Sequence, residues 1–240
     1  MNFAVKQMFA SLMVTCFLGS SAFAIAAEET PETKQYTDLA ELKADAAKVQ
    51  TEFKEGVHYK IIQGNGLSAQ KEVREYFSFF CGHCHAFYPV ISLIAQGLPE
   101  DTAFVGNPVY YLGGPMGKET QTGYAAAVSL GVTEKYVESL NKLIFDDNKI
   151  PQNHGELMQV FDIIGIPAHQ AEAQFKSFPI ANMVNQYDQH TKDSKISGVP
   201  SVVINNKYLI VAKEVKGEAQ YFALVNYLLG LDNDYYKPQK

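Results

Sequence analysis

Five short stretches of the chain carry the apolar pattern of β-strands. Each is rich in β-branched or aromatic residues and is bounded by turn-forming residues. The stretch that ends at Phe80 is apolar and rich in aromatic residues, which is typical of a buried strand. The expected strands are 57–62, 73–80, 102–111, 201–205 and 208–212, the last two joined by a hairpin at Asn206 and Lys207.

Apolar residues at helical spacing occupy most of the remaining chain. Directly after Cys81 the period changes, and Phe87, Ile91 and Ile94 fall on one helical face. The long stretch between the third and fourth strands carries only helical patterns, divided by glycines that end helices and polar residues that begin them. The expected helices are 37–51, 82–97, 119–130, 134–145, 154–164, 168–177, 180–192 and 218–229.

The order of these elements predicts the fold class. Strand, helix and strand in succession predict a right-handed βαβ unit, and two further strands and a helix follow a block of helices. We therefore expect an α/β fold whose sheet of four or five strands is interrupted in sequence by an all-α subdomain. The expected parts are an N-terminal extension (27–54), a discontinuous sheet-bearing domain (55–114 and 195–240) and a helical insertion (115–194).

The first 26 residues have the pattern of a secretory signal peptide. Lys6 precedes an apolar run, and small residues at Ala22, Ala24 and Ala26 provide cleavage sites. An uncleaved membrane anchor and a lipid-modified Cys16 are the alternatives. Cleavage leaves two cysteines, Cys81 and Cys84, in an exported chain.

Composition narrows the classes of function. With 47% hydrophobic residues, the 240-residue chain can bury a core without disulfide cross-links. Loss of Lys6 with the signal peptide leaves 19 basic and 26 acidic residues, a formal charge of −7. A mildly acidic chain with scattered charges has no basic patch for phosphates, so we expect no binding of nucleic acid.

The two remaining cysteines lie where the second strand ends and a helix begins. Unpaired N–H groups and the dipole at a helix N-terminus stabilise negative charge, so Cys81 is expected to be largely thiolate near neutral pH. His83 lies between the sulfurs in sequence and can stabilise that thiolate further. Gly82 keeps the loop open. A reactive, redox-active pair is therefore the leading interpretation of Cys81-Gly82-His83-Cys84.

Two other interpretations of the pair are weaker. A zinc site needs two further ligands at suitable spacing, and the remaining histidines are scattered singly, so no metal site is expected. A purely structural disulfide between Cys81 and Cys84 closes a very short ring and contributes only about 2 kcal/mol in the chain-entropy model.

The segment Tyr76–Cys84, followed by Phe87, resembles the active-site segment of the bacterial periplasmic DsbA-like thiol:disulfide oxidoreductases of the thioredoxin superfamily. Tyr111–Gly114, the helical block and Gly198–Pro200 follow in matching order, and the similarity extends from about Glu55 to the C-terminus. The resemblance implies a thioredoxin-like fold with a helical insertion. It also implies disulfide donation to newly exported proteins, without a cofactor beyond the cysteine pair.

The resemblance implies roles for five residues. Cys81 matches the nucleophilic cysteine that links to substrate, and Cys84 its buried partner. Val199 and Pro200 match a cis-proline pair whose backbone binds an extended substrate; from the pattern alone they are a loop before a strand. Glu75 matches a buried acidic residue beneath the active site; from the pattern alone it is an ordinary strand carboxylate.

The sequence also departs from the family pattern. Gly82 stands where the family often has proline, and Gly-His is instead the dipeptide of eukaryotic disulfide isomerases. His85 replaces a residue that is often aromatic. A buried lysine of some relatives would fall near Gly106, where this chain has none. The balance between oxidation and isomerisation is therefore open.

Three functional hypotheses follow. The first is a monomeric periplasmic oxidase of reduced exported proteins, reoxidised by a quinone-linked membrane protein similar to DsbB. The second is a disulfide isomerase or reductase, favoured by Gly82 and His83. The third is a peptide-binding, chaperone-like module whose disulfide is incidental, and loss of Cys81 separates it from the first two.

Overall fold

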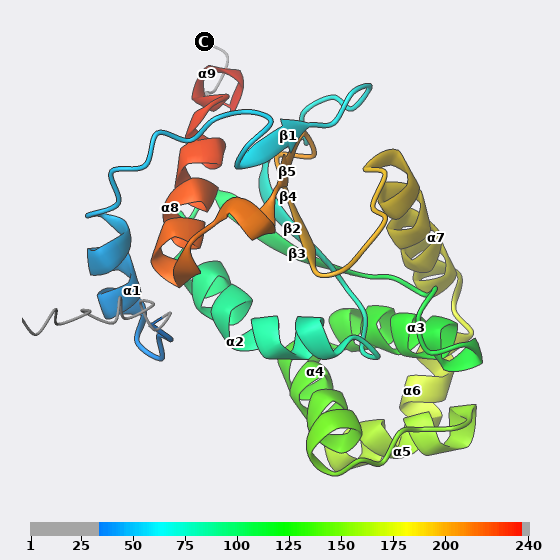
Figure 1. The fold of residues 1–240 in the computed structure, drawn as a ribbon. Helices are drawn as coiled ribbons and strands as arrows, with labels where there is room; N and C mark the ends of the chain where they lie inside the picture. The colour runs from blue at the N-terminus through cyan, green and yellow to red at the C-terminus, as the bar shows by residue number, and fades with distance from the viewer. Residues whose placement is uncertain (1–33, 237–240) are drawn as a thin grey trace, which may run out of the picture. The chain divides into compact units, whose positions relative to one another are not determined.

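The structure is a computed structural model that describes residues 34–236. The predicted signal peptide and Cys16 lie outside the described residues. Five strands form one mixed sheet in the order β1-β5-β4-β2-β3 (Figure 1). Strands β2 and β3 are parallel, and every other pair is antiparallel. The strands are β1 (Tyr59–Ile61), β2 (Lys71–Phe77), β3 (Thr102–Pro108), β4 (Ser201–Ile204) and β5 (Tyr208–Ile210).

Helices lie on both faces of this sheet and in a block between β3 and β4 in the chain. They are α1 (Leu39–Ala46), α2 (Gly82–Gly97), α3 (Pro115–Ser129), α4 (Thr133–Asn141), α5 (His154–Ile163), α6 (Ala168–Phe175), α7 (Phe178–Asp193), α8 (Gly217–Gly230) and α9 (Asn233–Tyr236). A π-helical turn (Lys142–Asp146) continues α4, and a 3-10 turn (Ala212–Glu214) follows β5. Within residues 34–236, no helix combines the length and apolar character needed to span a membrane. The predicted α/β class with inserted helices is confirmed.

Three groups of buried apolar residues hold the fold together. One joins α1, α2 and α8 to the sheet through residues such as Leu42, Ile91 and Leu224. A smaller one lies on the sheet face that carries α7, around Tyr76 and Val203. The third group of buried apolar residues lies among the helices between β3 and β4 and includes Cys81 and Cys84. The sheet is therefore covered on both faces, as its apolar strands require.

The largest differences between predicted and observed strand boundaries are at the ends of two strands. β2 ends at Phe77 rather than Phe80, and β3 ends at Pro108 rather than Tyr111. Phe77 and Pro108 are register partners, so the pairing of β2 with β3 stops at the same point in both strands. Pro108 has no N–H to donate, which favours the end of the ladder there. In the hairpin, the residues with positive φ are Asn205 and Asn206 instead of the predicted Asn206-Lys207 turn.

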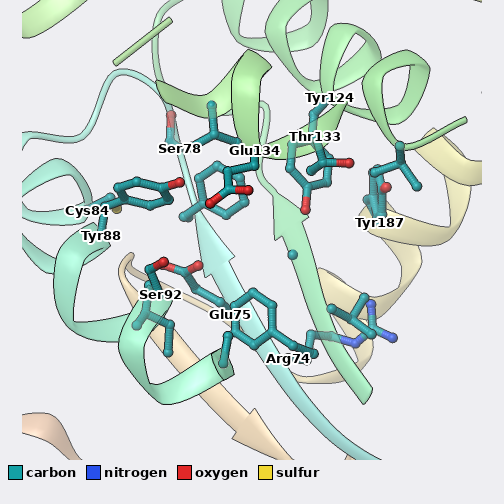
Figure 2. Close-up of a pocket in the computed structure, with 18 of the residues that line it drawn as sticks. Arg74, Glu75, Ser78, Cys84, Tyr88, Ser92, Tyr124, Thr133, Glu134 and Tyr187 are labelled. Carbon is teal, nitrogen blue, oxygen red and sulfur yellow. The ribbon is translucent and has the colours of Figure 1, made fainter. Parts of the chain in front are cut away.

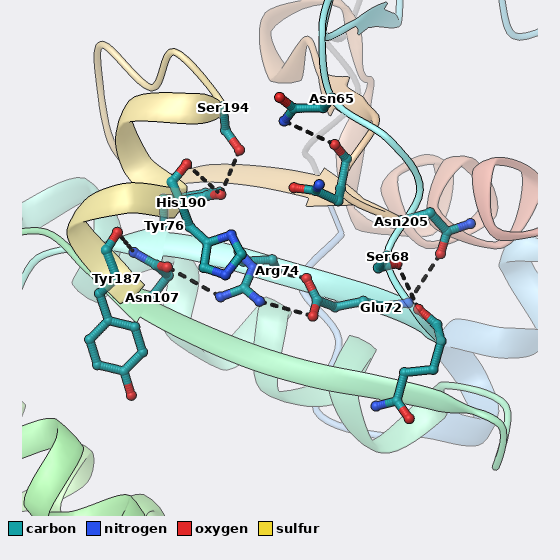
Figure 3. Close-up of polar contacts among 12 residues, drawn as sticks. Asn65, Ser68, Glu72, Arg74, Tyr76, Asn107, Tyr187, His190, Ser194 and Asn205 are labelled. Atoms are coloured by element: carbon teal, nitrogen blue, oxygen red, sulfur yellow. Dashed lines mark hydrogen bonds and ion pairs between the residues drawn. The ribbon is translucent and has the colours of Figure 1, made fainter. Parts of the chain in front are cut away.

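A buried polar network attaches α7 to the sheet (Figure 3). Arg74 donates two hydrogen bonds to the Glu72 carboxylate, at 2.8 and 2.9 Å, and a third at 3.2 Å to the Asn107 side-chain oxygen. The Asn107 amide then donates to the Tyr187 carbonyl and the Thr191 hydroxyl, both at 3.1 Å. Paired in this way, the buried charges are compensated.

Candidate active site

Cys81 caps the N-terminus of α2. Its backbone is extended, and its sulfur accepts a hydrogen bond from the Cys84 N–H at 3.1 Å. The turn Ser78–Phe80 connects β2 to this cap, and the Ser78 carbonyl accepts the Cys81 N–H. A sulfur in this position faces unpaired helix N–H groups and the positive end of the helix dipole. Cys81 thus lies at the strand–helix junction expected from the sequence, and its ionisation stays a prediction.

Burial distinguishes the two cysteines. Both are free thiols, and Cys81 keeps 8% of its surface exposed against 4% for Cys84. Burial, followed by the hydrogen bond with Cys81, raises the pKa of the Cys84 thiol well above its ordinary value. In the reduced pair the buried Cys84 thiol therefore keeps its proton.

Val199 lies opposite Cys81. The Cys81 thiol donates to the Val199 carbonyl at 3.5 Å, and the Val199–Pro200 peptide bond is cis. Strand β4 begins only at Ser201, and within residues 34–236 the Val199 N–H has no backbone acceptor. A backbone segment outside the sheet thus presents an available donor beside the reactive sulfur.

Gly82 and His83 lie at the surface, between the two cysteines in sequence. A side chain added at Gly82 would meet open space. His83 is exposed and forms no side-chain hydrogen bond with any residue in the described range. Its expected effect on the thiolate stays a prediction.

Glu75 lies in β2 beneath the cysteines and is only 6% exposed. Burial raises the pKa of its carboxyl from 4.5 to about 8. Its register partner in β3 is Gly106, where an added Cβ would lie 2.1 Å from the Tyr124 hydroxyl oxygen. The ring of Tyr124 thus fills the space that a lysine at Gly106 would need.

A cavity of about 760 Å³ connects Glu75 and Cys84 (Figure 2). Its walls come from β2, β3 and α2 on one side and from α3, α4 and α7 on the other. Tyr88 of α2 lines it near Cys84, and burial raises the pKa of this phenol to about 12. The buried carboxyl and the Cys84 side chain thus line one shared cavity, most of whose surface is apolar.

Sequence reasoning did not identify Tyr88, Tyr111 or the environment of His85 as parts of the site. Tyr88 follows Cys84 by four residues, so helical spacing places it on the same face of α2. The His85 ring stacks on Phe145, with centroids 4.3 Å apart, and joins α2 to the π-helical turn. No local sequence pattern predicts the contact between His85 and Phe145, because these residues are 60 positions apart in the chain.

The described residues contain no cluster of three or more His, Cys, Asp or Glu side chains able to hold a metal ion. What the geometry supports is thiol chemistry. A helix-capping sulfur, a protonated partner and a free backbone donor lie together at one end of the sheet.

Comparisons with known proteins point the same way. Residues 72–228 match the family described as the DSBA-like thioredoxin domain. The chain is 32% identical over 165 residues to the thiol:disulfide interchange protein DsbA of Yersinia pestis, which covers 66% of this chain and 77% of that protein. It is 28% identical over 160 residues to the protein of the same name from Escherichia coli K12, which covers 65% of this chain and 76% of that protein.

Solved structures agree in fold. Proteus mirabilis DsbA, in a complex with a non-covalently bound peptide, superposes with a TM-score of 0.69 at 30% identity, over 75% of this chain and 99% of that one. Pseudomonas aeruginosa DsbA superposes with a TM-score of 0.68 at 22% identity, over 78% of this chain and 97% of that one. The second likeness is one of fold alone.

Proposed function

This chain belongs to the DsbA-like thioredoxin domain family and is a protein thiol:disulfide oxidoreductase, and from this premise we propose that Cys81 is the cysteine that exchanges with substrate. The observation that carries the proposal is the asymmetry of the pair. Cys81 caps α2 and accepts the Cys84 N–H, whereas burial keeps the Cys84 thiol protonated. The redox group is the chain's own cysteine pair.

The exchange proceeds in two displacements. A substrate thiolate attacks the Cys81 sulfur of the Cys81–Cys84 disulfide, and Cys84 leaves as a thiolate that takes up a proton. A second substrate thiolate then attacks the substrate sulfur of the mixed disulfide, and Cys81 leaves as a thiolate. Two electrons pass from the substrate thiols to the pair. Stabilisation of the leaving Cys81 thiolate by the helix favours donation of the disulfide.

The substrate binds as an extended strand beside Cys81. Val199 provides the backbone for it, because its N–H has no backbone acceptor among the described residues and it precedes β4. Addition of a strand through main-chain hydrogen bonds tolerates many sequences, which suits an enzyme that acts on many clients. Pro200 fixes the chain at this position.

Glu75 tunes the pair from below. Its buried carboxyl shares a cavity with Cys84, and negative charge on it raises the pKa of the Cys84 thiol further. Gly82 and His83 influence Cys81 from the exposed side, where substrate approaches. These assignments rest on position and charge.

The cellular setting is the periplasm, reached through the signal peptide of residues 1–26. The substrates are reduced, newly exported proteins, and a quinone-linked membrane protein similar to DsbB reoxidises the pair. The enzyme acts as a monomer. Its discontinuous domain consists of residues 55–114 and 195–240, with the insertion 115–194 closing over the active-site end.

Cysteine variants test the role of Cys81. With a reduced model peptide, we expect Cys81→Ser to abolish oxidation. With the disulfide form of the same peptide, we expect the free Cys81 thiol of Cys84→Ser to displace one peptide sulfur and accumulate a mixed disulfide at Cys81, identified by mass after thiol trapping. A mixed disulfide at Cys84 of Cys81→Ser, with none at Cys81 of Cys84→Ser, would reverse the assignment.

The direction of the reaction needs a separate measurement, because Gly82-His83 leaves isomerase or reductase action as the alternative. The wild-type pair is equilibrated with reduced and oxidised glutathione, and the two forms are quantified by mass. A pair that becomes reduced at glutathione ratios that leave thioredoxin-type dithiols oxidised supports the oxidase. A pair that behaves like a thioredoxin assigns the protein to reduction or isomerisation.

A further inference from the structure

A second hollow, of about 780 Å³, lies beside the active site and has no part in the exchange step described above. One wall is formed by Tyr110 and Tyr111, which follow β3. The other is formed by the C-terminal half of α7 and the residues after it. The polar residues along this wall are Asn185, Asp188, Gln189, Thr191, Lys192 and Lys195, and Ile196 closes the end.

Two observations indicate that this groove lies on the same side of the molecule as the reactive sulfur. Burial raises the pKa of the Tyr111 phenol, and the electrostatic influence of Cys84 and Cys81 raises it further. Ile196 packs in the same small apolar cluster as Val199, whose carbonyl accepts from the Cys81 thiol. A chain that pairs with Val199 therefore has the groove within a few residues' reach, at about 3.3 Å per extended residue.

The groove has an excess of positive charge. Its one carboxylate, Asp188, is already engaged by Lys118 at 2.6 Å and by the Gln121 amide at 2.9 Å. Lys192 and Lys195 are exposed, and neither forms an ion pair with a carboxylate within residues 34–236. Lys195 donates only a long hydrogen bond, 3.5 Å, to the Gln63 carbonyl. On a chain with a formal charge of −6, two uncompensated ammonium groups line one groove.

The opposite wall is aromatic and open to solvent. Tyr110 and Tyr111 are 49% and 44% exposed, with ring centroids 6.3 Å apart and planes at 70°. The Lys118 ammonium lies 5.1 Å from the centre of the Tyr110 ring. Exposed tyrosines provide contact area and hydroxyl groups at a low cost in side-chain entropy.

We propose that this groove is a substrate subsite that selects cysteine-containing segments carrying an acidic side chain within a few residues of the reactive cysteine. The proposal rests on the exchange function at Cys81. The acidic side chain pairs with Lys192 and Lys195, while its neighbours in the extended segment lie against Tyr110 and Tyr111. Exposed pairs of this kind act mainly on the rate of association and weaken as salt rises.

The test measures how fast peptide thiols reduce the oxidised protein. Each peptide has one cysteine in a neutral sequence, and one flanking position carries Asp, Asn or Lys. A set of three such peptides is made for each of the four positions before the cysteine and each of the four positions after it. At one or more of these positions we expect the Asp peptide to react about three- to tenfold faster than the Asn peptide at low salt, and the Lys peptide to react more slowly than either.

The double variant Lys192→Gln/Lys195→Gln is expected to lose this preference, while its equilibrium with glutathione stays that of the wild type. Lys135→Gln is the matched control, because Lys135 is an exposed lysine of α4 outside the groove. Comparing the Asp-to-Asn rate ratio between protein variants cancels the effect of Asp on the peptide's own thiol.

The outcomes separate the two proposals. If neutral peptides react but Asp gives no advantage at any position, or if the advantage survives in the double variant, the subsite is wrong and the exchange function stands. If no peptide reduces the wild-type pair, the exchange function itself fails.

Discussion

At the scale of single residues, environment gives chemically identical groups different properties. Cys81 and Cys84 are three positions apart, yet Cys81 caps the helix, whereas the Cys84 thiol lies behind it and has a pKa that burial raises strongly. Glu75 shows the same effect. Its carboxyl lies in the sheet, without the solvent that would stabilise its charge.

The Glu75 carboxyl predicts a dependence of stability on pH. Its pKa is about 8 in the folded protein and 4.5 without burial, so between these values the folded state binds more protons than the unfolded state. Stability therefore falls as pH rises through this window. The comparison uses wild type and Glu75→Gln, both with the cysteine pair reduced. Between pH 5 and 8 we expect the free energy of unfolding of Glu75→Gln to rise relative to that of wild type, by up to about 1.4 kcal/mol per pH unit. Above pH 8 we expect this difference to level off.

Denaturant titrations of both proteins at unit steps from pH 5 to 9 measure this difference. A constant difference across the range would show that the carboxyl is already ionised in the folded protein.

At the scale of elements, the helices between β3 and β4 are joined by contacts that their own amphipathic patterns do not specify. His154 begins α5 and reaches Glu119 of α3 at 2.8 Å and Glu172 of α6 at 2.5 Å. Lys176 also pairs with Glu172, and the Phe175 ring meets the imidazole edge-on. One side chain thus links three helices.

This cluster predicts a pH-dependent contribution to the stability of the helical block. The hydrogen bond with Glu172 and then that with Glu119 raise the pKa of His154 above 6.5. The contribution is therefore complete below the unfolded value, near 6.5, and is lost as pH rises through the folded one. We expect the difference in Tm between wild type and His154→Gln to be largest near pH 6 and to shrink toward pH 9.

Thermal unfolding across this range tests the cluster, and Lys176→Gln serves as its control because that variant removes a pair without a titrating histidine. A His154→Gln effect that does not change with pH would mean that packing against Phe175 is its cause.

At the scale of the whole described molecule, the helices inserted between β3 and β4 are attached to the sheet by polar contacts as well as by apolar packing. Asn107 of β3 accepts from Arg74 of β2 and donates to two groups of α7 (Figure 3). Because α7 leads directly into the loop that contains Val199, its attachment to the sheet also positions that loop beside Cys81.

Asn107→Ala therefore leaves an Arg74 guanidinium N–H without its acceptor and removes both hydrogen bonds from Asn107 to α7. We expect a loss of about 1–3 kcal/mol in the free energy of unfolding, together with faster amide hydrogen exchange in α7. Thr191→Ala removes only one of the two acceptors of the Asn107 amide and is expected to cost about 0.5–1.5 kcal/mol. Equal effects of the two variants on stability and exchange would contradict the role of Asn107 as the link.

The sequence by itself determined the order of elements and the reactive pair. Apolar periodicity and glycine positions are local signals, so strand, helix and the cysteines at their junction could be placed from neighbours in the chain. Boundaries were less accurate where a ladder ends, as at Phe77 and Pro108, because the partner strand decides that point.

The tertiary structure alone decided which distant groups share an environment. It put the Val199 carbonyl at Cys81, Tyr124 in the space beside Gly106, and Lys192 and Lys195 opposite Tyr110 and Tyr111. It also buried Glu75 in a cavity with Cys84, which no local pattern distinguishes from an exposed strand carboxylate. Burial, pKa and pairing depend on atoms that are close in space and remote in sequence, whereas propensity and period depend on neighbours along the chain.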